Sequence, residues 1–398
     1  MPRTRGTQTS NRRSNNKWKL VIGAVTLVVA TFILTAGTFA YLFQSQSLDA
    51  ANSLRLYRAV DLIKSKYIEE TSMDQLINGA IKGMVSSLND PHSIFMDAKM
   101  FKEFMIETEG AFGGVGIVIG SKDKVLTVVS PIEGTPGDKA GIKSGDQIIT
   151  IDGKDTKDMA LDEAVSKIRG QEGSTVILGI RRLPAQEVKD YTLTRSNIQI
   201  KTVAGKVLPD KIGYIRISMF NEHTGADFAK KLQELDKEGI QALVLDLRDN
   251  PGGLLDESVK VAGKLMPKGP VVSVVTRDGN RETHTAGLDA AKYPIVVLVN
   301  GGSASASEIV AGALQDTGVG TLVGVKTFGK GSVQQILRLD SSTAVKLTIA
   351  KYYTPKDRSI NGVGIEPDVK VEWPEPRELG KDPQQDKAVE ILKAKLNK

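Results

Sequence analysis

The sequence predicts a mixed α/β protein, and three observations carry this prediction. Residues 50–109 place apolar side chains at helical spacing. From Gly110 onward the sequence changes to short β-rich runs separated by glycines. Between residues 196 and 374, apolar runs at 242–245 and 295–299 are typical of buried strands, and helical stretches follow them. The 398 residues suffice for two or three domains, each with its own core.

The distribution of charge argues against a nucleic-acid-binding protein. The chain has 53 Lys and Arg against 47 Asp and Glu, a formal net charge of +6. Residues 1–19 contain six of the basic residues and no acidic one, so 47 basic residues balance 47 acidic ones in the rest of the chain. A neutral body lacks the basic surface that binding to nucleic acid requires.

Cysteine and histidine usage excludes several kinds of site. The chain has no Cys, which rules out a thiol nucleophile, a disulfide framework and a Cys-ligated metal. Its three histidines, His92, His223 and His284, are far apart and lack the spacing of a zinc site. We therefore expect neither a metal nor another cofactor.

An apolar segment follows the basic N-terminus. No charged residue lies between Leu20 and Ser47, and about 20 apolar residues can span a bilayer as a helix. The six preceding positive charges predict a cytoplasmic basic tail (1–19), a transmembrane signal anchor (20–43) and an extracytoplasmic body. A cleaved signal peptide is the alternative, although its apolar region is usually only about 7–15 residues long.

Residues 110–195 resemble a PDZ domain. A Gly-rich loop at Gly114, Val115, Gly116 and Ile117 precedes a strand, and the runs 136–142 and 145–153, a helix near 160–169 and a strand at 175–181 follow in the order of that domain. The loop amides could converge on a chain-terminal carboxylate, and the strand edge could take up a peptide as an added strand. An ordinary small β-barrel with a tight glycine turn is the alternative.

One candidate catalytic segment runs from Asn300 to Glu308 and contains Ser305. It follows a buried strand and opens a helix, where a helix N-terminus favours negative charge. The spacing of Ser305 and Glu308 also fits a capping box, so Ser305 could simply cap the helix.

A second candidate segment, 329–334, contains Lys330 and Gln334. It nearly matches a nucleotide-binding P-loop, but Gly331 stands where that loop needs Ser or Thr. A surface lysine in a glycine turn is the plainer alternative. A third segment, 246–253, ends in Gly252 and Gly253, whose backbone N–H groups would suit an oxyanion hole, though it could equally be a plain strand-to-helix turn.

Together the three segments resemble the carboxy-terminal processing peptidases, also called tail-specific serine proteases. Pro374, Pro376 and Pro383 break the sequence after the core and predict a tail (375–398) that ends in a short basic helix near 389–396. The resemblance covers residues 50–374 and implies a helical segment (44–109), an inserted PDZ domain (110–195) and a crotonase-like spiral ββα protease core (196–374). It implies the following roles: Ser305 as nucleophile, Lys330 as base, Gln334 to orient the lysine, the amides of Gly253 and Ala306 as the oxyanion hole, and Arg169 to relay occupancy of the PDZ domain.

The chemistry of a Ser–Lys pair sets a condition on its surroundings. A serine hydroxyl is a weak nucleophile until a base takes its proton. A free lysine amine has a pKa of about 10.4 and is charged at neutral pH. Burial must lower that pKa by roughly three pH units, which costs about 4 kcal/mol. We therefore expect Lys330 to be desolvated in the active enzyme.

The expected function is an extracytoplasmic serine endopeptidase at the cell membrane, anchored by a single span. Its expected partners are unfolded proteins with free C-termini, and the N-terminal helices could form a homodimer. A catalytically silent PDZ adaptor is the main alternative, and an NTP-binding protein is a third. The joint presence of Ser305, Lys330 and Gln334 favours the protease, whereas Gly331 disfavours the nucleotide-binding protein.

Overall fold

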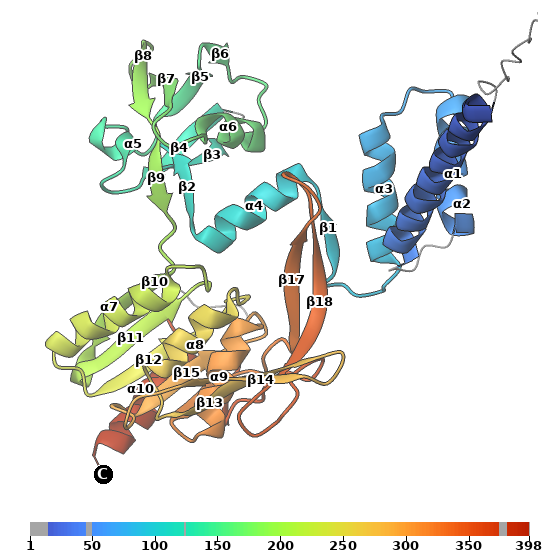
Figure 1. Cartoon of the computed structure of the whole chain (residues 1–398). Coiled ribbons are helices and arrows are strands. Elements are labelled where there is room, and N and C mark those ends of the chain that lie inside the picture. Colours follow the sequence, from blue (N-terminus) through green and yellow to red (C-terminus); the bar gives the residue numbers. More distant parts are fainter. Residues whose placement is uncertain (1–14, 45–49, 123–124, 374–379, 398) are drawn as a thin grey trace, which may run out of the picture. The chain divides into compact units, whose positions relative to one another are not determined.

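The computed structural model describes residues 15–44, 50–122, 125–373 and 380–397 (Figure 1). The chain divides into two compact units, Met1–Ala80 and Ile81–Lys398. Helices occur where the sequence predicts them between residues 50 and 109. The N-terminal helices are α1 (Asn15–Gln44), α2 (Ala50–Lys66), α3 (Met73–Ser86) and α4 (Ala98–Glu109).

The N-terminal helix α1 covers the apolar run on which the expected membrane anchor rests. Within the residues that the structure describes, no helix is both long enough and apolar enough to cross a membrane. The expected transmembrane helix over residues 20–43, and the single-pass anchoring derived from it, are therefore not supported. The expectation rested only on the length of the uncharged apolar run in the sequence. Most of the expected basic tail lies outside the described residues.

The PDZ region contains a sheet of strand order β3-β4-β5-β7-β8, in which β6 pairs with β5, and a separate two-stranded sheet of β2 and β9. Strand β3 is at the edge of this sheet. Alternate side chains of its strands, such as Val176, Leu178 and Ile180, pack with Ala164 and Ile168 of the helix in a separate apolar core. The elements are β2 (Ala111–Gly114), β3 (Ile117–Lys122), β4 (Val125–Pro131), α5 (Pro136–Lys139), β5 (Gln147–Ile151), β6 (Lys154–Asp155), α6 (Leu161–Ile168), β7 (Thr175–Arg181), β8 (Val188–Thr194) and β9 (Ser196–Gln199).

The core contains a six-stranded sheet of order β10-β11-β12-β15-β16-β19, which is parallel except for the pairing of β10 with β11. Every residue of β12 and β15 is buried, as their continuous apolar runs predict. The strands are β10 (Val203–Leu208), β11 (Ile212–Ile217), β12 (Ala242–Asp246), β15 (Ile295–Val299), β16 (Gly320–Gly324) and β19 (Val369–Lys370).

Helices cover both faces of this sheet. On one face Leu243 and Leu245 belong to a core shared with α7, α8 and α9, and on the other face Val244 packs in a cluster with α10. Successive side chains of each strand thus pack alternately into two apolar cores on opposite faces of the sheet, which explains why the strands are apolar throughout. The helices are α7 (Thr224–Lys237), α8 (Leu255–Gly263), α9 (Ala306–Asp316) and α10 (Pro383–Leu396), with a 3-10 turn at Pro209–Lys211.

The last helix, α10, begins earlier than the sequence suggested. We expected a helix near 389–396 and treated Pro383 as a break. Instead, Pro383 occupies the first turn and the carboxylate of Asp382 accepts a hydrogen bond from the Gln385 N–H at 2.9 Å. Proline lacks an N–H that the first turn would leave unbonded, and Asp is a preferred cap, so both residues start this helix.

A second sheet of order β1-β18-β13-β14 carries the hairpin of β17 and β18. Strand β1 reaches this sheet from the segment before the PDZ region and pairs antiparallel with β18. Residues near 95 are thereby placed beside residues near 345. The strands are β1 (Ile94–Met96), β13 (Gly269–Thr276), β14 (Arg281–Ala286), β17 (Ser332–Arg338) and β18 (Ala344–Tyr353).

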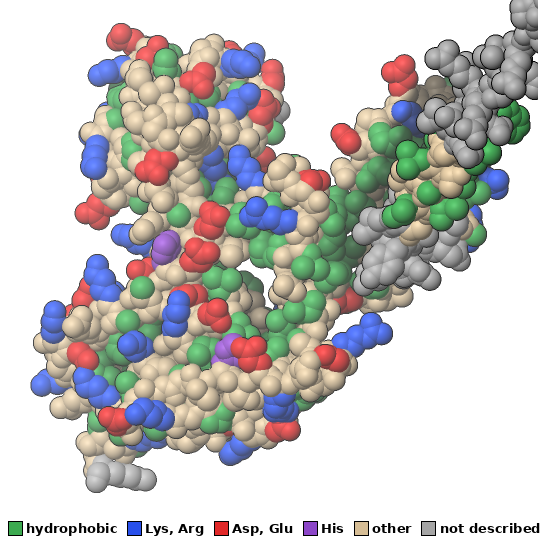
Figure 2. All heavy atoms as spheres, viewed as in Figure 1, with side chains coloured by type: hydrophobic (Ala, Val, Ile, Leu, Met, Phe, Trp, Pro, Cys, Tyr) green, Lys and Arg blue, Asp and Glu red, His purple; other side chains and the backbone are tan. Residues whose placement is uncertain are grey.

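The surface carries mixed charge. On the face drawn in Figure 2, basic and acidic side chains are interspersed over the core and the PDZ region, with no large area of one sign. This distribution matches the equal numbers of basic and acidic residues after residue 19.

Candidate active site

Three candidate catalytic residues line one cavity. Ser305, Lys330 and Gln334 contribute to a cavity of about 780 Å³ in the core, together with the turn 251–253 and the first residue of α9, Ala306. These residues come from three separate segments of the chain. The fold therefore brings together the side chains that the sequence motifs single out.

Ser305 occupies an unusual backbone conformation at the start of α9. Its φ is 55° and its ψ is −114°, whereas a residue that only caps a helix normally adopts extended angles. The Glu308 carboxylate accepts from the Ser305 N–H, as in a capping box, so the alternative from the sequence has a local basis. It does not explain the backbone angles, which cost roughly 1–3 kcal/mol and recur at functional sites.

The buried carboxylate of Glu308 connects the two motif segments. It accepts hydrogen bonds from the N–H of Ser305 at 2.9 Å and from the N–H of Lys330 at 2.8 Å. It also accepts from the Gly329 N–H at 2.8 Å and the Thr327 hydroxyl at 2.6 Å. A single side chain thus holds the backbone of the candidate nucleophile beside that of the candidate base.

Lys330 lies in the loop between β16 and β17 and is largely buried. Burial lowers the pKa of its amine, and the nearby positive charge of Lys346 lowers it further. No hydrogen bond or ion pair of the described residues involves its Nζ. The direction of the pKa change is the one that a lysine base requires. Strand β17 follows the loop directly, whereas a P-loop lysine opens a helix, so the nucleotide-binding alternative is wrong.

Gln334 projects from β17 beside a β-bulge. Its Nε2 donates to Ser332 Oγ at 2.8 Å and to Thr348 Oγ1 at 3.2 Å. The pairing of β17 with β18 shifts between Val333 and Gln334, and the shift places Gln334 opposite Thr348. Gln334 therefore lies in the cavity, but no hydrogen bond joins it to Lys330 in the described residues.

Two backbone N–H groups are free near Ser305. The Gly252 N–H donates to Asn250 Oδ1 at 2.9 Å and is therefore occupied. Among the described residues, neither Gly253 nor Ala306 uses its N–H in a hydrogen bond. A Cβ added to Gly252 would lie 2.8 Å from the Cβ of Ser305 and 2.9 Å from the N of Ala306. Gly252 is thus in direct contact with the start of α9, and Gly253 follows it.

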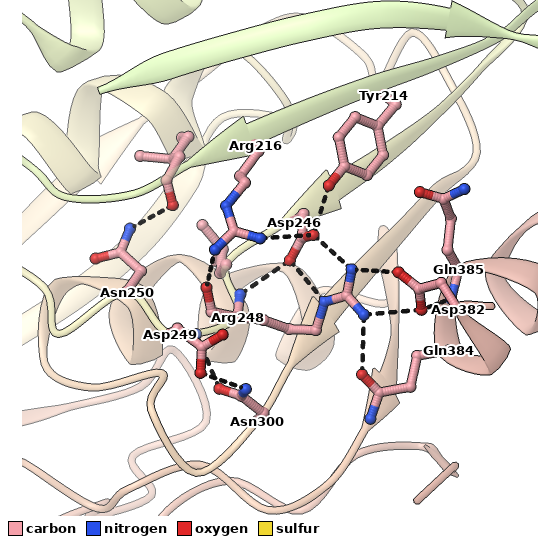
Figure 3. A network of polar contacts seen from close by, with 12 residues as sticks. Tyr214, Arg216, Asp246, Arg248, Asp249, Asn250, Asn300, Asp382, Gln384 and Gln385 are labelled. Carbon is pink, nitrogen blue, oxygen red and sulfur yellow. Dashed lines mark hydrogen bonds and ion pairs between the residues drawn. The ribbon is translucent and has the colours of Figure 1, made fainter. Parts of the chain in front are cut away.

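A network of charged side chains surrounds Arg248, immediately before the 249–253 turn. Figure 3 shows Arg248 between Asp246 and Asp382, with its guanidinium bonded to both carboxylates at 2.7–2.9 Å. Although burial favours neutral Asp246, the hydrogen bonds from Arg248 hold the pKa of that carboxyl below its ordinary value. Asp249 forms two hydrogen bonds with Asn300, at 2.9 and 2.8 Å. The turn is therefore tied both to α10 and to the segment that carries Ser305.

Sequence reasoning did not find Tyr352. This fully buried residue of β18 lines the cavity, and its hydroxyl donates to the Lys330 carbonyl oxygen. Burial and the charge of Glu308 raise its pKa, while a hydrogen bond with the Ser305 side chain opposes that rise. Tyr352 lies about 50 residues after Ser305 in a strand of ordinary composition, so no local signal marked it.

The candidate peptide-binding residues lie in the PDZ region and do not line the cavity. Val115 and Gly116 form the turn between β2 and β3, and no hydrogen bond of the described residues uses either N–H. Gly116 has a φ of 70°, and a Cβ there would lie 2.3 Å from Thr135. Arg169 follows α6, where its guanidinium stacks 4.2 Å from the ring centroid of Phe112 and burial lowers its pKa.

Comparison with known proteins identifies the family. Residues 211–371 match the model of peptidase family S41, residues 127–182 match a PDZ domain, and residues 40–100 match the N-terminal domain of the activating protease CtpB. The chain is 40% identical over 373 residues to a carboxy-terminal-processing protease of Bartonella bacilliformis, covering 89% of this chain and 84% of that protein. The chain belongs to the carboxy-terminal processing proteases. It is therefore a serine peptidase, a hydrolase of peptide bonds.

Further relatives belong to this family. The carboxy-terminal processing protease CtpB of Bacillus subtilis is 39% identical over 326 residues, which cover 81% of this chain and 68% of that protein. A photosystem II D1 C-terminal processing protease of known structure is 32% identical, with a TM-score of 0.47, and the match covers 80% of this chain and 92% of that one. The expected PDZ domain and protease core are confirmed, and the core matches peptidase family S41.

Proposed function

We propose that this protease cleaves protein substrates through an acyl-enzyme formed on Ser305, with Lys330 as the general base. The observation that carries the proposal is the meeting of Ser305, Lys330 and Gln334 in one cavity beside two free backbone N–H groups. The buried amine of Lys330 has a lowered pKa, so a larger neutral fraction is available to take a proton from Ser305.

The proposed reaction has two stages. In the first, the Ser305 oxygen attacks the peptide carbonyl carbon while Lys330 takes the hydroxyl proton and then gives it to the leaving amine. In the second, Lys330 takes a proton from water while the water oxygen bonds to the acyl carbon; the bond from that carbon to the Ser305 oxygen then breaks, and Lys330 returns the proton to that oxygen. The N–H groups of Gly253 and Ala306 would bind the oxyanion, and loss of one such donor typically lowers kcat by about 10²–10³.

Substitution of the pair tests the assignment. Ser305→Ala and Lys330→Ala should each abolish cleavage of casein, which is largely unfolded, while thermal unfolding stays close to that of the parent. Lys326→Ala is the matched control because Lys326 is an exposed residue of the same loop. If Lys330→Ala kept most of the rate, the base would be another group. If Ser305→Ala lost only stability, Ser305 would be no more than a helix cap.

We further propose that the PDZ domain captures the free C-terminus of a substrate. The two free N–H groups of Val115 and Gly116 would bind the carboxylate, and the edge strand β3 would pair with the substrate's tail. Arg169, at the end of α6, would relay occupancy towards the core. Unfolded proteins are the expected substrates because only a loose tail can add to a strand edge.

Amidation of the substrate tests this capture. It removes a charge-assisted interaction of about 1.5–3 kcal/mol, which corresponds to a roughly 10- to 100-fold lower kcat/KM. Gly116→Glu should lower kcat/KM similarly because the new side chain would collide with Thr135. Equal cleavage of free and amidated peptides by the intact enzyme would refute C-terminal capture.

We also propose that the catalytic body works outside the cytoplasm. The support is the order of six basic residues followed by an uncharged apolar segment, from Leu20 to Ser47, which is the order that export signals have. A reporter that is active only after export, fused after residue 60, should be active, and an inactive reporter would exclude this location. Dimerisation through the N-terminal helices is a further proposal, which the mass of the full chain in light scattering would test.

A further inference from the structure

The turn before β1 carries a hydrogen-bonded carboxylate. Asp90 Oδ2 accepts from the Ser93 hydroxyl at 2.6 Å, and Asp90 Oδ1 accepts from the His92 N–H at 3.0 Å. Ser93 Oγ in turn accepts from the N–H of Thr348 at 3.0 Å. The turn is thereby attached to β18, more than 250 residues later in the sequence.

Thr348 links this turn to the candidate active site. Its N–H donates to Ser93 Oγ, which in turn donates to the Asp90 carboxylate. Although burial opposes it, hydrogen bonds hold the pKa of Asp90 below its ordinary value. Thr348 Oγ1 accepts from Gln334 Nε2 at 3.2 Å. The β-bulge makes this contact because it sets Gln334 opposite Thr348 rather than opposite Ile349.

The carboxylate gives this chain of hydrogen bonds a direction. An ionised carboxylate only accepts, so the Ser93 hydroxyl donates its single hydrogen to Asp90, and the Ser93 oxygen accepts from the Thr348 N–H. The Thr348 hydroxyl oxygen accepts from Gln334, whose only donor group is the amide NH₂. Ser332 Oγ accepts from the same NH₂ at 2.8 Å. With Nε2 bonded to two hydroxyls, Oε1 is the amide atom left for another partner.

We propose that Asp90 and Thr348 are positioning residues for the base: they fix the Gln334 amide so that its oxygen accepts from the Lys330 amine. Lys330 Nζ has no partner among the described residues, and Gln334 lines the same cavity. A fixed acceptor would orient the lone pair of neutral Lys330 towards Ser305. This inference rests on the proposed Ser–Lys mechanism and adds the residues that hold its base.

Charges from three parts of the fold also act on Lys330. Lys346 of β18 lowers its pKa, whereas Asp90 and Glu308 raise it. His92, in the Asp90 turn, has its own pKa lowered by burial and by the charge of Lys330. Tyr352 contacts the Lys330 carbonyl oxygen from β18. Removal of the Asp90 charge should therefore change the pH profile, and removal of the Thr348 hydroxyl should not.

Three variants separate these effects in the full-length enzyme, with labelled casein as substrate. Thr348→Val loses the hydroxyl, and kcat should fall about 10- to 100-fold with little change in KM. Thr348→Ser keeps the hydroxyl and should restore most of that loss. Asp90→Asn should lower kcat similarly and also move the acid limb of the kcat profile to lower pH, because the Asp90 charge raises the pKa of Lys330.

The controls make each outcome decisive. Asp74→Asn, an exposed acidic residue in the first turn of α3, should leave kcat and the pH profile unchanged. Parent-like kcat in Thr348→Val, equal losses in Thr348→Ser and Thr348→Val, or an unmoved acid limb in Asp90→Asn would each overturn the inference. Should Asp90→Asn not fold, the two Thr348 variants still decide. Activity in Lys330→Ala would instead overturn the proposed base itself.

Discussion

The two halves of the candidate active site are held by different kinds of contact. The nucleophile half comprises the 249–253 turn and the start of α9, which are joined by backbone hydrogen bonds such as Ala304 N to Asn250 O at 3.0 Å. The base half comprises Lys330 and Gln334, and side-chain hydroxyls on β17 and β18 hold its amide. Glu308 connects the two halves through backbone N–H groups.

This difference suggests how each half tolerates change. In the nucleophile half the contacts are between backbone atoms, and no space is left for an added side chain. Because no flexible side chain there can move to relieve a clash, a substitution should lower both stability and activity. Hydroxyl and charge contacts in the base half can change while the strands stay paired. We therefore expect changes there to alter the rate or the pH profile more than stability.

The largest expected effect is in the nucleophile half. Gly252 has a φ of 103°, and an added Cβ would lie 2.7 Å from Ala304 O and 2.8 Å from Ser305 Cβ. Gly252→Ala should lower kcat by at least about 10³-fold, because the nucleophile and the oxyanion donors would both move. It should also lower the melting temperature, which calorimetry would measure alongside kcat.

Gly301→Ala is the matched control. Gly301 precedes the same helix, but a Cβ there would meet nothing within 4 Å. Its kcat and melting temperature should stay close to those of the parent. A fully active Gly252→Ala enzyme would show that the nucleophile half is less rigid than its contacts indicate.

An intermediate effect is expected in the base half. The positive charge of half-buried Lys346 lowers the pKa of Lys330, so Lys346→Met should raise that pKa. Since only the neutral amine acts as a base, a higher pKa requires a higher pH for the same activity. The acid limb of the kcat/KM profile should therefore move to higher pH, with little change in melting temperature.

Lys346→Arg keeps the charge and should leave the acid limb where it is. A downward move in Lys346→Met would contradict the assignment of Lys330 as the titrating base. A large fall in melting temperature would instead contradict the distinction between the two halves.

The smallest effect is expected behind the 249–253 turn. Asp382→Asn removes one of the two carboxylates that bind Arg248 (Figure 3) and weakens the start of α10. Because the Asp382 side chain is partly exposed, we expect a loss of about 1 kcal/mol of stability and a few-fold lower kcat. Denaturant unfolding and initial rates would measure both effects. Asp386→Asn, in the first turn of the same helix, should change stability less.

Short-range patterns were enough to predict much of the fold. The apolar runs that became β12 and β15 are buried on both sides, and such strands have few alternatives to continuous apolar sequence. The start of α9 was predicted from a strand, a glycine turn and a capping box, all within ten residues. By contrast, the start of α10 was missed because Pro383 was taken as a break rather than as a first-turn residue.

The amino-acid sequence by itself determined the family, the PDZ domain and the two motif segments, because these depend on residues that are neighbours along the chain. Only the tertiary structure decided which N–H groups near Ser305 are free, since Gly252 and Gly253 look alike in the sequence. It also decided the approach of Ser93 to Thr348 and of Tyr352 to Lys330. Those contacts depend on strand pairing and on one β-bulge, which no local pattern encodes.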